Sequence, residues 1–475
     1  MISWLRREWS LGLALALALA LRVYQLGDQI LVGDEWHALD KAASAGWLEI
    51  ATTFGRADHS IPIALYDRAL ASTIGLSEPW IRAPFLLSGL VLVLVLPLAA
   101  RRFVPRAVAD ALAWLLATSP VLVFYSRFAR PYTLTCPLAL LAVWLAWRFW
   151  DERRAGFGLG YALCVASAGY LHAAVLPFVL APLALFAFLA LRSRRGEDLR
   201  AVLAVGVITG FACALALLPP FVFDAENMGR KSGFGLPQPI TVIRALRLLA
   251  GPSSSVLAYG FALPCAFGCW WLVRRERLAR LFALAACAQA LAVLAIAPAH
   301  RSDIFAFARY LLPLLPCGLL ALACGLWMPL RNLPERVQAG LGPLVGVFLV
   351  AAGPLAPALS QRTNWAANEL VLHMLGQDED FGERVPRVSD FYRDLGRRAP
   401  GSVTLIEAPW FPPIFANAEV YYQRLHRQVV RVGFLSEPGG GPVRQGEPAY
   451  PASGFRLAHF LFVEDLLRDP APKAD

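Results

Sequence analysis

The chain has 475 residues, of which 57% are hydrophobic and 16% charged, and its formal net charge is +10 at pH 7. Its mean hydropathy of +0.53 excludes an ordinary soluble globular protein, whose surface would need more polar residues. The basic residues are spread through short connections and do not gather on one polar domain, which argues against nucleic acid as a partner and in favour of membrane lipids.

Long apolar runs dominate residues 1–359 and predict a mainly α, polytopic bundle of about eleven transmembrane helices, because roughly 17 to 25 apolar residues cross the hydrocarbon core as a helix. The first run follows Arg6 and Arg7, as in a signal peptide, but it is long and no small-residue cleavage site follows it, so we expect an uncleaved span. The expected spans cover approximately residues 9–26, 82–100, 107–124, 132–149, 157–173, 174–191, 201–220, 255–273, 280–298, 309–329 and 339–358.

The stretch "IPIALYDRALASTIGL", residues 61–76, is short and carries Asp67 and Arg68 in its middle. If this stretch does not cross the bilayer, every strongly basic short loop falls on the same side, as the positive-inside rule requires. We therefore expect a cytoplasmic N-terminus and one long external loop at 27–81, with interfacial helices lying on the bilayer.

From residue 360 onwards the composition is that of an ordinary soluble protein. The patterns predict a strand within 401–410, a helix over 417–428 and a second strand within 429–435. The chain is thus expected to form two domains, a transmembrane domain at 1–359 and a small periplasmic α/β domain at 360–475.

The first external loop holds two polar clusters, "GDEWH" with Asp34, Glu35 and His37, and "RADHS" with Asp58 and His59. Adjacent carboxylates diverge by about 100° on a helix, so one can act as a base while its neighbour orients it or pairs with a cation. A solvated surface loop is the alternative. The side chains of Asp34, His37, Asp58 and His59 also suit a divalent metal, but their spacing has no diagnostic pattern. The sequence thus gives no reason to require a cofactor. A divalent metal bound by these side chains stays an open alternative.

Several arginines fall on the predicted outer side, where the topology rule does not favour cations. Arg127 and Arg130 in "YSRFARPYTL" are three residues apart and share a face if the segment is helical, while Pro131 suits a break or a fresh helix start. Planar guanidiniums match phosphate oxygens, which predicts a phosphate clamp. The alternative is that both side chains extend to lipid headgroups.

Further polar residues lie at the ends of other spans. His172 follows one span, and Arg301 and Arg309, with Tyr310, bracket a short external loop. These residues can supply additional phosphate contacts or form a structural ion pair.

The acidic "GDEWHA" after the first span, the block "SPVLVFYSRFARPYTL" at 119–134 and the later "ARYLLPLLP" at 308–316 together resemble the integral-membrane GT-C glycosyltransferases. This superfamily includes the dolichyl-phosphate-mannose protein mannosyltransferases and the bacterial aminoarabinose-to-lipid-A transferases. The resemblance covers most of residues 1–330. One departure is that many relatives have paired prolines after the histidine, whereas here Ser60, Ile61 and Pro62 follow His59.

The resemblance implies inverting transfer of a hexose or pentose from a polyprenyl-phosphate donor to a glycolipid, glycan or protein acceptor. The reaction would take place on the periplasmic side of a bacterial inner membrane. Asp34 corresponds to the catalytic base, with Glu35 beside it. The residues expected to bind substrate are Asp58, His59, Tyr66, Arg127, Arg130, Tyr132, His172, Arg301, Arg309 and Tyr310.

A transporter or flippase of lipid-linked glycans is the main alternative function, because it would also need cations for a phosphate headgroup. Transporters usually contain internal repeats and functional polar residues near the middle of their spans. This sequence shows no visible repeat, and its polar clusters lie in external loops. A catalytically inactive relative that acts as a scaffold is a third alternative, against which the presence of Asp34 and Glu35 argues.

Overall fold

The structure is a computed structural model of the whole chain, and it describes residues 2–24, 26, 31, 34–54, 60–229, 236–295, 304–356, 390–399, 401–405 and 428–430. By its internal packing the chain divides into two units. Unit 1 consists of Met1–Tyr24, Pro84–Ala358 and Leu370–Gln377, and unit 2 of Gln25–Ala83, Leu359–Glu369 and Asp378–Asp475. Helix α5 (Glu78–Ala100) begins in unit 2 and continues in unit 1.

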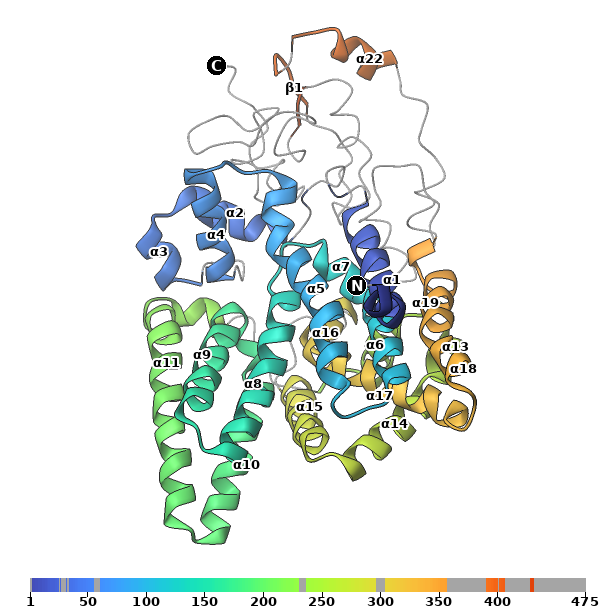
Figure 1. Cartoon of the computed structure of the whole chain (residues 1–475). Helices are drawn as coiled ribbons and strands as arrows, with labels where there is room; N and C mark the ends of the chain where they lie inside the picture. Colours follow the sequence, from blue (N-terminus) through green and yellow to red (C-terminus); the bar gives the residue numbers. More distant parts are fainter. Residues whose placement is uncertain are drawn as a thin grey trace. The chain divides into compact units, whose positions relative to one another are not determined.

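All regular secondary structure among the described residues of unit 1 is helical (Figure 1). Its elements besides α5 are α1 (Ile2–Val23), α6 (Arg106–Thr118), α7 (Pro120–Ser126), α8 (Tyr132–Glu152), α9 (Ala155–Leu171), η2 (Ala173–Val175), α10 (Leu176–Ser193), α11 (Gly196–Gly229), α12 (Pro239–Ala250), α13 (Ser255–Gly260), α14 (Ala262–Arg275), α15 (Arg277–Ala295), α16 (Ile304–Tyr310), η3 (Leu312–Leu314), α17 (Leu315–Trp327), η4 (Met328–Leu330), α18 (Glu335–Ala339) and α19 (Leu341–Ala352).

Among the described residues, eight helical segments are long and apolar enough to cross a membrane, or nine if the bent pair α6 and α7 counts as one span. The chain is therefore a polytopic membrane protein. Helices also cover the two remaining predicted spans, since α1 has 22 residues and α9 has 17. The total of eleven spans stays a prediction.

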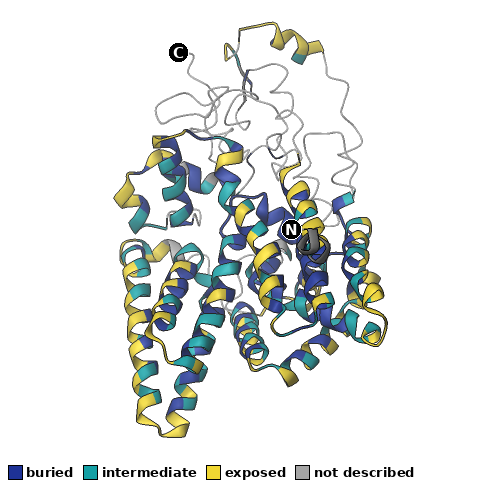
Figure 2. Cartoon of the chain, in the orientation of Figure 1, coloured by how far each residue is buried: buried dark blue, intermediate teal, exposed yellow. Residues whose placement is uncertain are grey.

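The helices of unit 1 differ greatly in burial (Figure 2). Every residue of α6 from Val108 to Thr118 is buried, and α1, α17 and α19 pack around it. By contrast, Val207, Phe211 and Leu215 on α11 are 64 to 70% exposed. Large exposed apolar side chains on a long helix indicate a surface that faces lipid.

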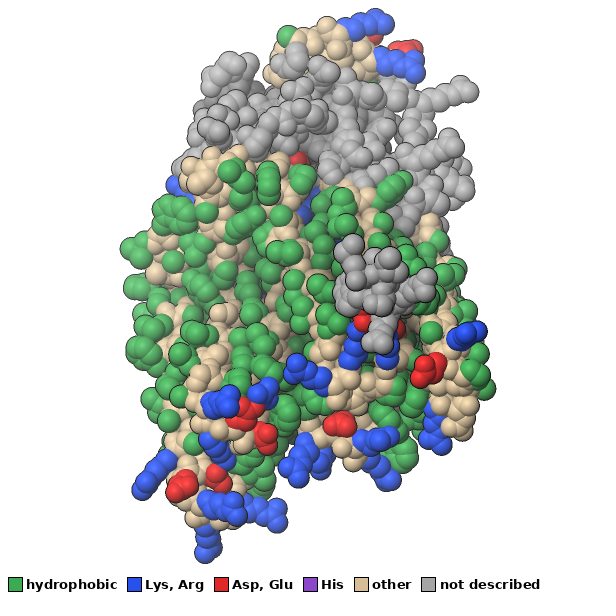
Figure 3. All heavy atoms as spheres, in the orientation of Figure 1, with side chains coloured by type: hydrophobic (Ala, Val, Ile, Leu, Met, Phe, Trp, Pro, Cys, Tyr) green, Lys and Arg blue, Asp and Glu red, His purple; other side chains and the backbone are tan. Residues whose placement is uncertain are grey.

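The outer surface of unit 1 carries a broad hydrophobic band, and Lys and Arg side chains gather at its lower end in Figure 3. The turn between α10 and α11, which contains the exposed Arg194 and Arg195, lies at this end. Such a distribution is typical of a membrane protein whose basic loops lie on one side.

The predicted span 107–124 is not one straight helix. It bends by 57° between α6 and α7, with Ser119 extended at φ −61° and ψ 116° and Pro120 as the first residue of α7. A proline disfavours helical backbone at the residue before it and suits the first turn of a new helix, which explains the break.

In unit 2 the described helices are α2 (Glu35–Ser44), α3 (Trp47–Thr52), α4 (Ile61–Ser72), the start of α5, and α22 (Asp390–Gly396). With 12 residues, α4 is too short to cross the hydrocarbon core, as expected for the stretch 61–76. The only described strands, β1 (Thr404–Leu405) and β2 (Val429–Val430), pair in parallel and fall inside the two predicted strand segments. The predicted helix 417–428 lies almost wholly outside the described residues, so the α/β domain stays a prediction.

Candidate active site

Asp34 is the N-cap residue of α2, and its side chain is one third exposed. The residue three positions later, His37, lies on the same helical face, with its Nε2 atom 3.5 Å from Asp34 Oδ1. The carboxylate makes no capping hydrogen bond to its own helix. Asp34 thus presents an accessible carboxylate beside an imidazole, at the helix end where the dipole favours negative charge.

Glu35, the neighbour of Asp34, has a different environment. Its Oε1 and Oε2 accept hydrogen bonds from Arg82 Nε and Nη2 at 2.9 and 2.8 Å, and both side chains are fully buried. Two parallel charge-assisted bonds fix both groups in one geometry. Of the two roles considered for the second carboxylate, these contacts favour the partner of a cation over the orienter of Asp34.

Asp67 on α4 is a second buried carboxylate in unit 2. It is fully buried, and neither of its oxygens has a hydrogen-bond partner among the described residues. Burial and the nearby charge of Glu35 raise its pKa well above the ordinary value of a carboxyl group. From the sequence, Asp67 was only a reason why its segment should not cross the membrane.

Tyr66, predicted to bind substrate, is partly exposed and donates a hydrogen bond to the Trp80 carbonyl oxygen at 2.8 Å. Burial, followed by the charge of Asp67, raises the pKa of its phenol. Asp58, His59 and Arg301 lie outside the described residues. Within the described part of the chain, no three His, Cys, Asp or Glu side chains come together as a metal site.

Arg127 belongs to unit 1 and lies just after the end of α7. Its Nη1 atom donates to the carbonyl oxygens of Leu21 and Tyr24 at 2.9 and 2.7 Å, so the buried guanidinium caps the end of α1. The segment from Arg127 to Pro131 is not helical, and Arg127 and Arg130 therefore do not share a helix face. Pro131 is the N-cap residue of α8, in agreement with the expected fresh helix start.

Arg22 of α1 makes a corresponding contact in the other direction, from α1 to the end of α6. Its role was not predicted from the sequence. Its guanidinium is fully buried and donates to the carbonyl oxygens of Leu116 and Ala117, at the end of α6, at 3.1 and 3.0 Å. Its Nε atom donates to Ser126 Oγ at 3.1 Å. Two arginines thus hold α1 against the bend between α6 and α7, and an arginine inside an apolar run was the available sequence signal.

Five of the predicted substrate-binding residues of unit 1 come together around the ring of Tyr132. The guanidinium carbons of Arg130 and Arg309 lie 5.9 and 5.7 Å from its centroid. The ring of His172 lies 5.1 Å from that of Tyr132 and 5.3 Å from that of Tyr310. The Tyr132 hydroxyl is buried and has no hydrogen-bond partner in the described residues. We call these five residues the Tyr132 cluster.

The backbone around this cluster is held by Gln289 of α15, another residue that the sequence analysis missed. Its Nε2 atom donates to the carbonyl oxygens of Ala174 and Tyr310 at 2.8 and 3.1 Å, and its Oε1 atom accepts from the Phe178 amide at 3.2 Å. The side chain is 1% exposed. Gln289 therefore connects the segment after His172 to the end of α16, and an amide in the middle of an apolar span was its sequence signal.

A crystal structure of ArnT from Cupriavidus metallidurans bound to undecaprenyl phosphate matches this chain with a TM-score of 0.52 at 18% sequence identity, over 78% of this chain and 71% of that one. The chain has the GT-C glycosyltransferase fold. Apo ArnT from the same organism gives a TM-score of 0.49 at 19% identity over 77% and 70% of the two chains. The Archaeoglobus fulgidus oligosaccharyltransferase tethered with an acceptor peptide gives 0.44 at 13% identity over 94% and 61%. No protein family model and no curated protein matches the sequence.

The GT-C match confirms, at the level of the fold, the resemblance drawn from the sequence motifs. At 18% identity the match shows that the helices are arranged in the same way, but it does not show the role of any residue. Any role of the Tyr132 cluster or of Asp34 therefore depends on the contacts of these residues in this chain.

Within the GT-C fold, Gln289→Leu tests whether the buried amide holds the segments around the Tyr132 cluster. The variant keeps a similar volume but leaves two carbonyls and one amide without their partner, which costs about 1 to 3 kcal/mol for an unsatisfied buried group. We expect a lower melting temperature and faster amide hydrogen exchange at residues 172–178 and 304–314. Exchange in α14, which Gln289 does not contact through a hydrogen bond, should stay unchanged. Unchanged exchange at both segments would contradict the assignment.

Proposed function

We propose that the chain transfers a sugar from a polyprenyl-phosphate donor to a hydroxyl of a glycolipid, glycan or protein acceptor, with inversion at the anomeric carbon. The observation that carries the proposal is the Tyr132 cluster, in which Arg130 and Arg309 both lie over one buried tyrosine ring in the membrane unit. Cations at such a position suit a lipid phosphate. ArnT, which shares the fold, has been crystallised with undecaprenyl phosphate.

In the proposed reaction Asp34 takes the proton of the acceptor hydroxyl as the oxygen attacks the anomeric carbon. The bond between the anomeric carbon and the phosphate oxygen breaks, and its electron pair leaves with the polyprenyl phosphate. His37, 3.5 Å from Asp34, holds the carboxylate in place. The leaving phosphate gains negative charge, which the guanidiniums of Arg130 and Arg309 stabilise without a general acid.

We also propose an orientation in a bacterial inner membrane. The basic loops lie in the cytoplasm, as the positive-inside rule predicts, and the first external loop and the C-terminal tail lie in the periplasm. Lys and Arg side chains at one end of the hydrophobic band support this orientation.

Undecaprenyl phosphate is expected to raise the melting temperature of the purified wild-type protein, because a ligand that binds only the folded state stabilises it. Arg130→Gln and Arg309→Gln should each weaken this binding about tenfold or more, since each removes a charged hydrogen-bond donor. Arg195→Gln, in the exposed turn between α10 and α11, is the matched control and should bind like the wild type. If both cluster variants keep the wild-type affinity, the Tyr132 cluster is not the phosphate site.

A further inference from the structure

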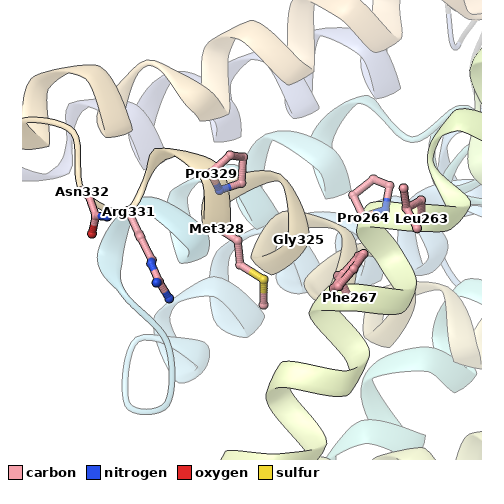
Figure 4. A pocket seen from close by; sticks show the side chains of 8 residues that line it. All are labelled: Leu263, Pro264, Phe267, Gly325, Met328, Pro329, Arg331 and Asn332. Carbon is pink, nitrogen blue, oxygen red and sulfur yellow. The ribbon is translucent and has the colours of Figure 1, made fainter.

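A groove lies between α14 and the end of α17, in a part of unit 1 that the proposed reaction does not use (Figure 4). Its volume is about 560 Å³. Leu263, Pro264 and Phe267 of α14 line one part, Gly325, Met328 and Pro329 the middle, and Arg331 and Asn332 the other end. The groove is thus apolar along most of its length and polar at one end.

Close contact between two helix backbones fixes the floor of the groove. A Cβ atom at Gly325 would lie 1.8 Å from the Pro264 carbonyl oxygen, and one at Gly268 would lie 1.7 Å from the Ala321 carbonyl oxygen. Only glycine allows this approach at either position. The groove is therefore set by the crossing of α14 and α17 and not by side-chain rotamers alone.

The polar end of the groove coincides with the end of a membrane span. The span Leu312–Leu330 ends directly before Arg331, whereas Leu263 and Phe267 lie within the span Ser255–Arg275. Arg331 is exposed and forms no salt bridge with any described residue. A guanidinium at the surface and an apolar wall within the span match the two parts of a phospholipid.

Tryptophans and arginines next to the groove mark the same level of the membrane. The Trp271 and Trp327 rings lie 6.0 Å apart, and Arg275 lies over the Trp271 ring at 4.8 Å. Arg274 lies over the Trp270 ring at 4.6 Å. Tryptophan gathers at the membrane–water interface, and clustered arginines attract anionic headgroups there.

We propose that this groove binds one anionic phospholipid, with its phosphate on Arg331 and Asn332 and an acyl chain along Leu263, Pro264 and Phe267. The planar guanidinium donates to two phosphate oxygens, and the Asn332 amide donates to the headgroup. The acyl chain covers Leu263 and Phe267, which are 66% and 51% exposed. This site is independent of the proposed glycosyl transfer, because it shares no residue with Asp34 or the Tyr132 cluster.

Native mass spectrometry of the full-length protein, titrated with phosphatidylglycerol or phosphatidylcholine, tests the proposal. We expect one tightly bound phosphatidylglycerol, and Arg331→Gln should weaken its binding about fivefold, the effect of removing one cation near the headgroup. Arg336→Gln is the matched control, since Arg336 lies on the same connection, is exposed and does not line the groove. Arg336→Gln should bind phosphatidylglycerol like the wild type, and phosphatidylcholine should bind more weakly and without dependence on Arg331.

Three outcomes would overturn the assignment. The first is an Arg331→Gln variant that binds phosphatidylglycerol as tightly as the wild type. The second is displacement of phosphatidylglycerol by glycerol 3-phosphate, which has the headgroup chemistry but no acyl chain. The third is displacement by undecaprenyl phosphate at lower concentration than by phosphatidylglycerol itself, which would make the groove a site for the polyprenyl carrier.

Discussion

Asp34→Asn is expected to lower the rate of glycosyl transfer by about a thousandfold, because a positioned general base contributes roughly 10² to 10⁴ to such reactions. Asparagine has the same shape but cannot take a proton from the acceptor hydroxyl at neutral pH. The measurement is the transfer rate with a polyprenyl-phosphate sugar as donor. Undecaprenyl phosphate should still raise the melting temperature of this variant, since the proposed phosphate contacts are in the Tyr132 cluster.

The loss of activity can be separated from loss of folding. Asn serves as an N-cap residue about as well as Asp, and the Asp34 side chain makes no capping bond in the structure, so the stability of α2 should change little. Glu49→Gln is the matched control, because Glu49 is an exposed carboxylate of the same unit that pairs with Lys41. It should retain full activity. Transfer by Asp34→Asn at the wild-type rate would show that another group is the base.

The positions of the membrane helices were predictable from apolar length, because crossing the hydrocarbon core is a constraint on each segment by itself. The bend between α6 and α7 shows where this reasoning fails. Pro120 lies in the predicted span 107–124, yet its apolar length alone predicted a single helix. At Pro120 the local rule determined the structure, whereas Pro97 and Pro137 lie inside continuous helices.

The candidate site was predictable in part. Arg130 was singled out as a pair with Arg127, His172 by itself, and Arg309 together with Arg301 and Tyr310. Each lies at the outer end of a predicted span, and the structure brings Arg130, His172 and Arg309 to Tyr132. A single sequence does not show which distant residue a charged side chain will pair with. Glu35 and Arg82 are 47 positions apart, and no local pattern tells which carboxylate a distant arginine will take.

The environments of Asp34 and Glu35 differ for a geometric reason that the sequence already contained. Successive side chains on a helix point about 100° apart, so two adjacent side chains can have different surroundings. Glu35 is the inward member and is buried against Arg82, whereas Asp34 is partly exposed beside His37. The motif thus combines a buried carboxylate paired with an arginine and a partly exposed carboxylate beside a histidine.

Glu35→Gln is expected to destabilise the protein by about 3 to 5 kcal/mol, because it breaks a buried ion pair by removing the carboxylate that accepts two hydrogen bonds from Arg82. The melting temperature and the denaturant midpoint measure this loss. Replacing both members by apolar residues of similar size, Glu35→Leu with Arg82→Met, should recover much of the stability, because both charges of the buried pair are then removed. A double variant as unstable as Glu35→Gln would show that the pair stabilises the fold through contacts beyond the neutralisation of one charge by the other.

Asp67→Asn makes the same carboxyl-to-amide change at another fully buried position in unit 2 and is expected to cost less than about 1 kcal/mol, since Asp67 loses no hydrogen bond that the described residues provide. The pKa of Asp67 is raised, so the folded protein keeps this proton at pH values where the unfolded chain, with a carboxyl pKa of about 4, has lost it. The wild type therefore loses stability as the pH rises from about 4 towards the pKa of the folded state. Asp67→Asn removes this dependence. The melting temperature of the variant relative to that of the wild type should therefore rise with pH over that range.

An Asp67→Asn variant as unstable as Glu35→Gln at neutral pH would contradict this expectation, because it would show that Asp67 makes an interaction that asparagine cannot replace.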